Sequence, residues 1–379
     1  MTTTRAANGL SSGPYLFTSE SVTEGHPDKV CDYISDSILD AYLEKDSKSR
    51  VACEVLCKEN IVIIAGEMTS SMVIDHEAVA RKAIRDIGYT DPSVSFNADG
   101  VTVYQFVSKQ SLEIAQGVNF ETNIEHEQGA GDQGIMFGYA SDETPELMPL
   151  PILLAHRLAK GLAEDRLSGK CPWLKPDGKT QVTVRYEEDA PVAVTNAIVS
   201  PQHDSSVSRE SIVSYVIESL APRALGDWFT KNIQFHVNPT GSFILGGPSA
   251  DAGVTGRKII VDTYGGAGRH GGGAFSGKDP SKVDRSGAYF CRYIARQIIK
   301  QGMARKAEIQ ISYAIGLAHP LSVKVETFGT GDPLAAAEFA QGLDFRPAAI
   351  IERFNLLQPI YRKTTNYGHF GKPGLPWEK

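Results

Sequence analysis

Glycines and cations concentrate in one stretch of the chain, and together they indicate a site for a compact anion. Residues 265–277 include seven glycines, and the surrounding stretch 257–285 carries six Lys or Arg against three Asp, a net charge of +3 in a chain whose net charge is −7. Bare backbone N–H groups and side-chain cations can share the oxygens of a polyphosphate. We therefore predict a polyphosphate site, whereas a solvated surface loop is the simpler alternative.

Two familiar nucleotide motifs occur within this stretch, and each lacks part of its context. Residues 266–271 fit GxGxxG after the strand-like segment 258–264, but glycine continues to Gly277 where a dinucleotide fold needs a helix. Residues 272–278 fit GxxxxGK, but Asp279 stands where a P-loop needs a Ser or Thr hydroxyl for magnesium. Neither motif is therefore sufficient to assign a fold.

Length and composition indicate a globular protein of two or three domains. The chain has 379 residues, 41% hydrophobic and 22% charged, and no apolar run approaches the length of a membrane span. Five scattered cysteines without a CxxC pair suggest neither a disulfide framework nor a zinc site, so we expect a reducing cytoplasm. The acidic net charge argues against a nucleic-acid partner, and no feature suggests a membrane partner.

Hydrophobic periodicity predicts the same order of elements three times along the chain. The first pass reads helix, hairpin, helix and strand, and the later passes follow a similar plan. Three similar α+β units are the simplest account. The expected elements are 28–44, 50–57, 61–68, 75–87 and 101–107, then 150–167, 179–187, 192–199, 208–220 and 233–237, then 286–299, 307–314, 321–328, 333–339 and 347–354.

The segment before the first helix combines unusual residues at a helix start. Pro27 suits the first helical position, which places His26 at the N-cap and Asp28 in the first turn, beside the positive end of the helix dipole. Ser, Asp and Asn are the usual caps, so His26 is a candidate for chemistry, whereas Asp28 is also explained by capping alone.

The two arms of the first hairpin each carry a glutamate. Glu54 and Glu67 would ordinarily be solvent-facing, but the apolar residues 63–65 before Glu67 make buried, ligated carboxylates plausible.

Six long motifs in order give the chain a close resemblance to the S-adenosylmethionine synthetase family, also called methionine adenosyltransferases. The resemblance runs from residue 17 to the C-terminus, and its motifs are GHPDK, GAGDQG, PDGKTQ, NPTGSFILGGP, TGRKIIVDTYGG and GGGAFSGKDPSKVDRS. It implies that methionine sulfur attacks C5′ of ATP and expels triphosphate, which is then cleaved to pyrophosphate and phosphate.

The resemblance also implies an α+β architecture of three similar α/β-sandwich domains around a pseudo-threefold axis. The corresponding sequence units are 15–112, 128–244 and 245–379, with a mobile active-site loop at 113–127 and a disordered tail at 1–14. Family members form dimers whose active sites lie between subunits, and these often pair into tetramers. The structural domains can interleave along the sequence.

Residue roles follow from the family motifs at matching positions. The catalytic residues would be His26, Lys179, Arg257, Lys278 and Lys282. The ATP contacts would be His26, Asp132, Asp177, Lys179, Ser242, Phe243, Asp251, Arg257, Lys258, Ala274 and Lys278, and the methionine contacts Glu67, Gln110, Asp251 and Lys282. Two magnesium ions and one potassium ion are implied, with Asp28, Asp284 and Glu20 as magnesium ligands and Glu54 as the potassium ligand.

Two alternatives stay open, one from a departure from the family pattern and one from the near-P-loop run. Ser242 stands where the family usually carries a basic residue before Phe243. A missing cation could weaken triphosphate binding, so a catalytically silent binding paralogue is one alternative. A phosphoryl-transferring ATPase built on residues 272–278 is the other.

Overall fold

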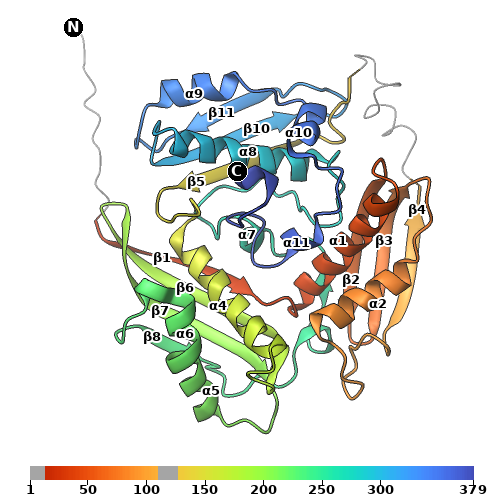
Figure 1. Cartoon of the computed structure of the whole chain (residues 1–379), viewed down its shortest axis with the longest axis vertical. Coiled ribbons are helices and arrows are strands. Elements are labelled where there is room, and N and C mark those ends of the chain that lie inside the picture. Colours follow the sequence, from red (N-terminus) through yellow and green to blue (C-terminus); the bar gives the residue numbers. More distant parts are fainter. Residues whose placement is uncertain (1–12, 110–126) are drawn as a thin grey trace.

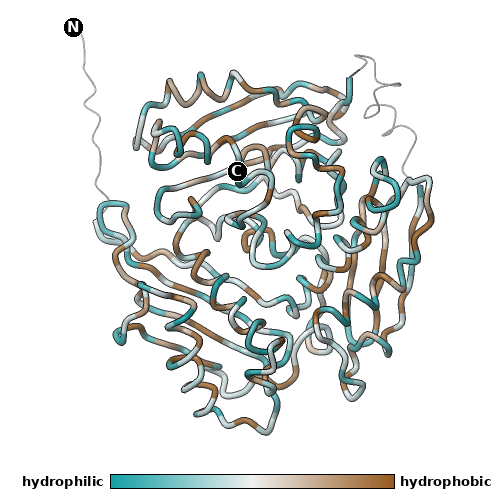
Figure 2. The backbone as a smooth tube through the Cα atoms, in the orientation of Figure 1, coloured by the Kyte–Doolittle hydropathy of each residue, from teal (hydrophilic) through white to brown (hydrophobic). Residues whose placement is uncertain are grey.

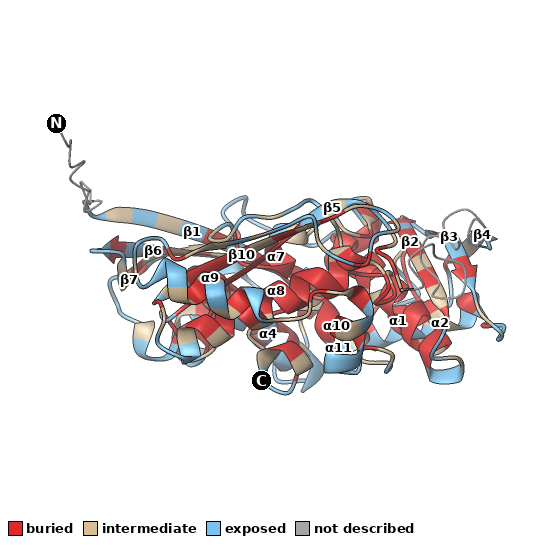
Figure 3. Cartoon of the chain, turned by 90° about the horizontal axis from the view of Figure 1, so that it is seen from above, coloured by how far each residue is buried: buried red, intermediate tan, exposed pale blue. Residues whose placement is uncertain are grey.

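A computed structural model describes residues 13–109 and 127–379. Three β-sheets lie around a common centre in Figure 1, and each carries one long helix. Figure 3 shows the molecule edge-on, with the strands along its upper side and the long helices along its lower side. The chain therefore forms three α/β units arranged with pseudo-threefold symmetry, as the motifs predicted.

The first sheet has the strand order β4-β3-β2-β9. Strands β2 and β3 form an antiparallel hairpin, and β4 lies parallel to β3. Helices α1 and α2 pack together, and α1 contacts β2. The elements are α1 (Pro27–Lys45), β2 (Arg50–Lys58), β3 (Ile61–Thr69), α2 (His76–Ile87), β4 (Thr102–Ser108) and β9 (Gly253–Val254).

The second sheet repeats this plan with the order β8-β7-β6-β1. Strands β6 and β7 are again an antiparallel hairpin, β8 is parallel to β7, and α4 covers β6 and β1. The elements are β1 (Tyr15–Val22), α4 (Leu150–Leu167), β6 (Leu174–Glu187), β7 (Ala190–His203), α5 (Arg209–Tyr215), the π-helix Val216–Leu220, α6 (Ala221–Leu225) and β8 (Gln234–Val237).

The third sheet has three strands in the order β11-β10-β5, and α8 packs on β5 and β10. Two shorter helices, α9 and α10, complete the unit, and the C-terminal segment returns to the centre of the molecule (Figure 1). The elements are β5 (Gly134–Ser141), α7 (Ile259–Asp262), α8 (Val283–Lys300), β10 (Lys306–Tyr313), β11 (Ser322–Glu326), α9 (Pro333–Gln341), α10 (Pro347–Phe354) and α11 (Arg362–Thr365).

The units exchange one strand each in a cyclic order. Strand β1 precedes α1 in the chain but pairs with β6 of the second sheet, β5 precedes α4 but pairs with β10 of the third, and β9 precedes α8 but pairs with β2 of the first. Each exchanged strand is antiparallel to its partner. The exchange makes each sheet depend on a segment from another third of the sequence.

Most expected helices and strands are present within a few residues of their predicted bounds. Strands β1 and β5 were not predicted, because each completes the sheet of another unit and lies outside the repeated order. The prediction of a strand at 258–264 was wrong, since this segment contains the short helix α7. Lys258 precedes that helix with a backbone far from extended, at φ −116° and ψ 33°.

Two hydrophobic cores hold the units together. One fills the second unit, and the other joins the first and third units with the C-terminal segment. In Figure 2 the apolar residues run along the strands and helices, whereas the outer turns are polar. No helix within the described ranges is long and apolar enough to cross a membrane.

Four buried aspartates on α1, at positions 28, 32, 36 and 40, form a stripe that binds loops from the centre of the molecule to the first unit. The four carboxylates are spaced four residues apart, so they share one face of the helix, and all are buried. Each accepts hydrogen bonds from backbone N–H groups distant in the sequence: Asp28 from Val254, Asp32 from Gly256, Asp36 from Gly277, and Asp40 from Tyr361 and Arg362.

Asp36 has the most completely satisfied carboxylate of this stripe. Both of its oxygens accept hydrogen bonds from Arg285, at 2.7 and 2.9 Å, and both side chains are fully buried. Gly277 N–H and the hydroxyl of Thr365 complete the set at 2.9 Å each. Loss of either charge would leave the other buried without compensation.

We expect Asp36→Asn to lower the free energy of unfolding by about 3 to 5 kcal/mol, because Arg285 would keep a buried charge without its partner. Urea unfolding followed by circular dichroism measures this loss. Asp86→Asn is the matched control, since Asp86 pairs with Lys82 at the surface and should contribute less than about 1 kcal/mol. Equal losses in the two variants would contradict the role assigned to Asp36.

Candidate active site

The start of α1 places His26 at a helix N-cap, as predicted. Its backbone is extended, with φ −60° and ψ 137°, and Pro27 opens the helix. Nδ1 of His26 accepts a hydrogen bond from the Asp28 N–H at 3.2 Å. In the neutral ring the proton therefore lies on Nε2, which leaves Nε2–H free to donate to a ligand.

His26 is held neutral by its surroundings. Burial lowers its pKa to about 3, and the positive charge of Lys258 acts in the same direction. Lys179 and Lys29 lower the pKa further, and only the carboxylate of Asp28 opposes them. His26 is thus a neutral hydrogen-bond donor amid cations.

The cationic side chains of the 253–258 segment lie around Asp28 at the start of α1. Its Oδ2 accepts a hydrogen bond from Lys258 Nζ at 2.6 Å, and its Oδ1 lies 3.9 Å from Nε of Arg257. Burial acts to raise the pKa of Asp28, but the hydrogen bonds from Lys258 and from the Val254 N–H outweigh it, so the pKa is lowered. The carboxylate is therefore ionised at neutral pH.

Asp177 and Lys179 approach the same region from β6. Lys179 is exposed and pairs with Val22 of β1, whereas Asp177 is buried and accepts hydrogen bonds from the N–H groups of Gly178 and Gly247 at 2.7 and 2.8 Å. Burial raises the pKa of Asp177 to about 6. In this structure Asp177 therefore holds the 246–251 segment in place.

The segment 242–251 carries three further residues of the expected nucleotide site. Phe243 is half-buried, and hydrogen bonds in both directions join its backbone to His203. Ser242 and Asp251 are exposed on either side of it, and the negative charge of Asp251 is one of the influences that raise the pKa of Asp177. The segment thus runs from the second unit towards Asp28.

The glycine-rich stretch brings a second group of charges. Lys278 Nζ donates to Asp284 Oδ2 at 2.7 Å, and Lys282 Nζ donates to the buried carboxylate of Asp279. Ala274 packs against Gly256, where an added Cβ would lie 2.4 Å from its own. The stretch and the 253–258 segment are therefore in direct contact.

Several glycines of this stretch are required by contact with the protein itself. A Cβ at Gly271 would lie 1.7 Å from the carbonyl oxygen of Ile135, one at Gly273 would lie 2.2 Å from Asp284, and one at Gly277 would lie 2.0 Å from the carbonyl oxygen of Cys53. The stretch is thus anchored on both neighbouring sheets rather than being a free loop. Gly272 has open space around it and a φ of +94°, which only glycine adopts readily.

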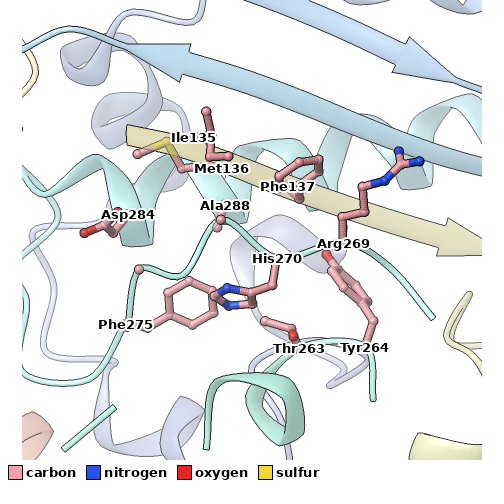
Figure 4. A pocket seen from close by; sticks show the side chains of 12 residues that line it. Ile135, Met136, Phe137, Thr263, Tyr264, Arg269, His270, Phe275, Asp284 and Ala288 are labelled. Atoms are coloured by element: carbon pink, nitrogen blue, oxygen red, sulfur yellow. The ribbon is translucent and has the colours of Figure 1, made fainter. Parts of the chain in front are cut away.

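A cavity of about 10 Å³ lies beneath the stretch, with room for about one water molecule. Figure 4 shows the rings of His270 and Phe275 side by side, and Ile135, Met136 and Phe137 of β5 along the other side of the cavity. The void is too small for a substrate, so any ligand lies outside it.

The two glutamates of the first hairpin lie near the second group of charges. Glu54 and Glu67 are exposed on the neighbouring strands β2 and β3, so the structure does not bury them as their apolar neighbours suggested. Partial burial still raises the pKa of Glu54, the charge of Lys278 opposes this, and the charges of Asp32 and Glu67 raise it further. These groups therefore influence one another electrostatically.

The other expected residues have separate positions. Glu20 is exposed on β1, and Asp132 is exposed just before β5, where a Cβ at Gly134 would lie 3.6 Å from Asp284. Gln110 and residues 113–126 of the expected loop lie outside the described residues. The expected tail does so as well, up to residue 12.

The whole chain is similar to known proteins. Family models for the N-terminal, central and C-terminal domains of S-adenosylmethionine synthetase match residues 14–112, 127–243 and 245–379. The S-adenosylmethionine synthase of Sorangium cellulosum is 55% identical over 372 residues, which are 96% of this chain and 87% of the relative. That of Akkermansia muciniphila is 54% identical over 376 residues, or 97% and 95% of the two chains.

The chain belongs to the S-adenosylmethionine synthetase family. As a synthetase of this family it is an enzyme, a methionine adenosyltransferase. The resemblance found in the motifs and the predicted fold class are therefore confirmed.

The carboxylates of this synthetase suit magnesium that arrives with a phosphorylated substrate. Among the described residues no cluster of three or more His, Cys, Asp or Glu side chains could hold a metal by itself. Asp28 and Asp284 instead offer single hard oxygen donors, each beside a lysine. Magnesium is commonly bound through one or two carboxylates together with substrate phosphates, so these residues fit it.

Sequence reasoning missed the groups that support the site. Lys29 is buried between Asp262 and Asp32, at 2.6 and 3.0 Å, and Asp32 in turn holds the N–H of Gly256 at 2.8 Å. A signal was present, because aspartate recurs every fourth residue from 28 to 40 on a helix whose surroundings are apolar. The apolar periodicity of this helix does not reveal the aspartate repeat.

The neutral state of His26 predicts a pH effect on stability. Its folded pKa is about 3 and its ordinary value is 6.5, so only the unfolded chain binds a proton between these values. The free energy of unfolding therefore falls as the pH drops below 6.5, by roughly 1.4 kcal/mol per pH unit from this residue. Between about pH 6.5 and pH 5 the wild type should lose roughly 2 kcal/mol more than His26→Gln in urea unfolding.

The exposed His319 provides the control for this measurement, because its side chain is 73% exposed. His319→Gln should follow the wild-type pH curve. If the free energy of unfolding changed with pH in the same way for the wild type and His26→Gln, His26 would have the same pKa in the folded and unfolded states, which would contradict the prediction.

Proposed function

We propose that this synthetase joins methionine to ATP by attack of the methionine sulfur on C5′. A C5′–S bond forms, the C5′–O bond breaks, and its electron pair leaves with the triphosphate. The same site then hydrolyses triphosphate to pyrophosphate and phosphate before S-adenosylmethionine leaves. Family membership supports the overall activity, and the arrangement of charges supports this route.

The observation that carries the proposal is the convergence of a neutral donor and several cations around one carboxylate. Asp28 contacts Arg257 and Lys258, and the charge of Lys179 reaches His26 beside it. Lys278 adds a further cation from the glycine-rich stretch. A leaving triphosphate carries the complementary charge, and each charge-assisted hydrogen bond to it would contribute about 1.5 to 3 kcal/mol.

The methionine sulfur needs no base, so the residues of the site would align it with C5′ and stabilise the charge of the leaving triphosphate. A thioether sulfur is already nucleophilic, and correct positioning against C5′ can contribute about 7 to 11 kcal/mol. We assign the Nε2–H of His26 to the oxygen that bridges C5′ and the triphosphate. That oxygen gains charge as the bond breaks, so a neutral donor there stabilises the transition state more than the ground state.

The ion pairs of the substrate-free chain would separate when nucleotide binds. Lys258 and Lys278 would turn from Asp28 and Asp284 towards phosphate oxygens, which frees both carboxylates to hold magnesium. Magnesium bound there would neutralise part of the triphosphate charge. The metal ions that we propose for the site are two magnesium ions, with Glu20 as a further ligand, and one potassium ion at Glu54.

The other substrate contacts are assigned from the family motifs. Phe243 would stack on adenine, with Ala274 and the segment held by Asp177 beside it, and Asp132 and Asp251 would contact the nucleotide. Methionine would contact Glu67, Gln110, Asp251 and Lys282. Ser242 supplies no cation at its position, so we assign that part of the triphosphate to Lys179 and Arg257.

An uncovered apolar sheet face supports a dimer with shared active sites. Strands occupy one face of the flat molecule and the long helices the other (Figure 3). On the first sheet, Phe106 is 66% exposed and Tyr104 is 48% exposed, with Leu56 and Ile61 on the same face. We propose that a second copy covers this face and completes the site, as a dimer or within a tetramer.

A cytoplasmic location agrees with the state of the cysteines. All five are free and buried, so the fold does not depend on oxidation. We propose the reducing cytoplasm as the location on this basis.

Product analysis tests the proposed reaction. With ATP, methionine, magnesium and potassium, we expect S-adenosylmethionine, pyrophosphate and phosphate in equal amounts, all dependent on methionine. Formation of ADP would instead identify a phosphoryl-transferring ATPase. Binding of both substrates without any product would identify a silent paralogue.

Removal of the His26 donor should slow the chemical step. We expect His26→Ala to lower kcat by about 100- to 1,000-fold with little change in KM, because the donor acts on charge that develops in the transition state. His26→Asn keeps a good N-cap and an N–H donor, so it should lose less. Equal losses in both variants would assign His26 a structural role.

A charge on the uncovered sheet face should separate the subunits. We expect the wild type to sediment as a dimer or tetramer, and Phe106→Glu to sediment as a monomer with little activity. Leu334→Glu is the control, since Leu334 is 68% exposed on α9, away from the sheet face. A fully active monomer would contradict the shared site.

A further inference from the structure

A second, larger pocket opens on the helical side of the molecule, away from the proposed active site. Its volume is about 410 Å³, and it lies between α4 and the C-terminal segment 362–373. Both elements lie on the face opposite the strands in Figure 3. Lys179 lies on the other face of β6, because the next residue, Thr180, donates a hydrogen bond to Ala155 of α4 and successive strand residues alternate between faces. Among the described residues, none of those assigned above to ATP, methionine or metals lines it.

The lining of this pocket is strongly cationic. Four Lys or Arg side chains lie around one carboxylate, Glu146, and Lys372 lies at the inner end; the four are Arg157, Lys160, Arg362 and Lys363. Arg157 binds Glu146 at 2.8 Å, and Arg362 lies 3.6 Å from Asp40. Lys160 is paired only loosely, at 3.6 Å from Glu164, and Lys363 forms no ion pair within the described part of the chain. The pocket therefore keeps uncompensated positive charge.

Polar groups at the inner end of the pocket are also unusual. Lys372 Nζ donates to the carbonyl oxygens of Thr364, Lys363 and Asn366, and burial together with the charge of Lys29 lowers its pKa to about 7. His156 is buried, and its Nε2 has no hydrogen-bond partner among the described residues. Buried polar atoms normally have partners, so this end of the pocket has capacity for a polar ligand.

The walls between these polar groups are apolar. Met148 and Leu153 line the pocket from the start of α4, and Tyr367 and Phe370 line it from the C-terminal segment. Pockets that bind small molecules combine such apolar walls with a few converging polar groups, at volumes of about 300 to 1,000 Å³. The walls would suit a ring, and the cations would suit phosphate.

We propose that this pocket binds a small phosphorylated molecule that carries a ring, of mononucleotide size. The phosphate would lie at the outer cations, Lys160 and Lys363, and the ring between the apolar walls. A charge-assisted contact from each lysine would hold the phosphate, and Arg157 would stay with Glu146. This site is separate from the proposed active site, and it does not depend on the reaction proposed there.

Hydrogen exchange with AMP as the probe locates the binding. We expect AMP to protect residues 148–160 and 362–373 in the wild-type protein. The double variant Lys160→Glu with Lys363→Glu should weaken this protection, with an apparent Kd at least about tenfold higher, since two cations become anions. Binding of AMP at the active site would be seen separately, as protection of 253–258 and 265–278.

A matched double variant controls for total charge. Lys82→Glu with Lys324→Glu changes two exposed lysines, each beside a carboxylate, on α2 and β11, and neither residue lines this pocket. It should bind AMP at 362–373 like the wild type. Lys363→Gln gives a milder test if the first double variant does not fold.

Three outcomes would overturn the proposal. AMP could leave 362–373 unprotected, or protect it equally in both double variants. Inorganic phosphate could also protect the segment at the same concentration as AMP, which would show that the ring contributes nothing.

Discussion

The buried aspartate stripe of α1 is the constraint on which the site depends. Four carboxylates at 28, 32, 36 and 40 lie on a helix face that in most proteins would be apolar, and each accepts a hydrogen bond from a backbone N–H far along the chain. Buried charges are costly, so such a stripe favours folding only when all its partners arrive together. It therefore links the helix that carries His26 to the loops that carry the cations.

The cyclic exchange of strands gives this arrangement its rigidity. Each sheet takes its inner edge strand from another third of the sequence, so no unit completes its sheet alone. The segments that follow β1 and β9, before α1 and α8, hold four of the five candidate catalytic residues, and the fifth, Lys179, pairs with the end of β1. Functional groups thus lie where the units interlock, and a disturbance in one unit would displace the groups of the next.

The glycines of the glycine-rich stretch have a cause within the protein itself. The composition of this stretch predicted a close approach of the backbone to an anion. The structure adds a second cause, because Gly271, Gly273 and Gly277 lie against Ile135, Asp284 and Cys53 so closely that no side chain would fit. These contacts hold Lys278 beside Asp284 while Gly272 stays open. The stretch therefore connects the first and third sheets, in addition to being a candidate phosphate site.

The sequence alone determined the helices, the hairpins, the N-cap at His26 and the family, because these follow from local periodicity, capping and motifs of adjacent residues. It did not reveal β1, β5 or the short helix α7, nor that the aspartates of α1 are buried. Those features depend on which distant segments meet, and local patterns carry no record of a partner far along the chain. Only the tertiary structure decided that Asp28 would meet Lys258 and that Asp36 would meet Arg285.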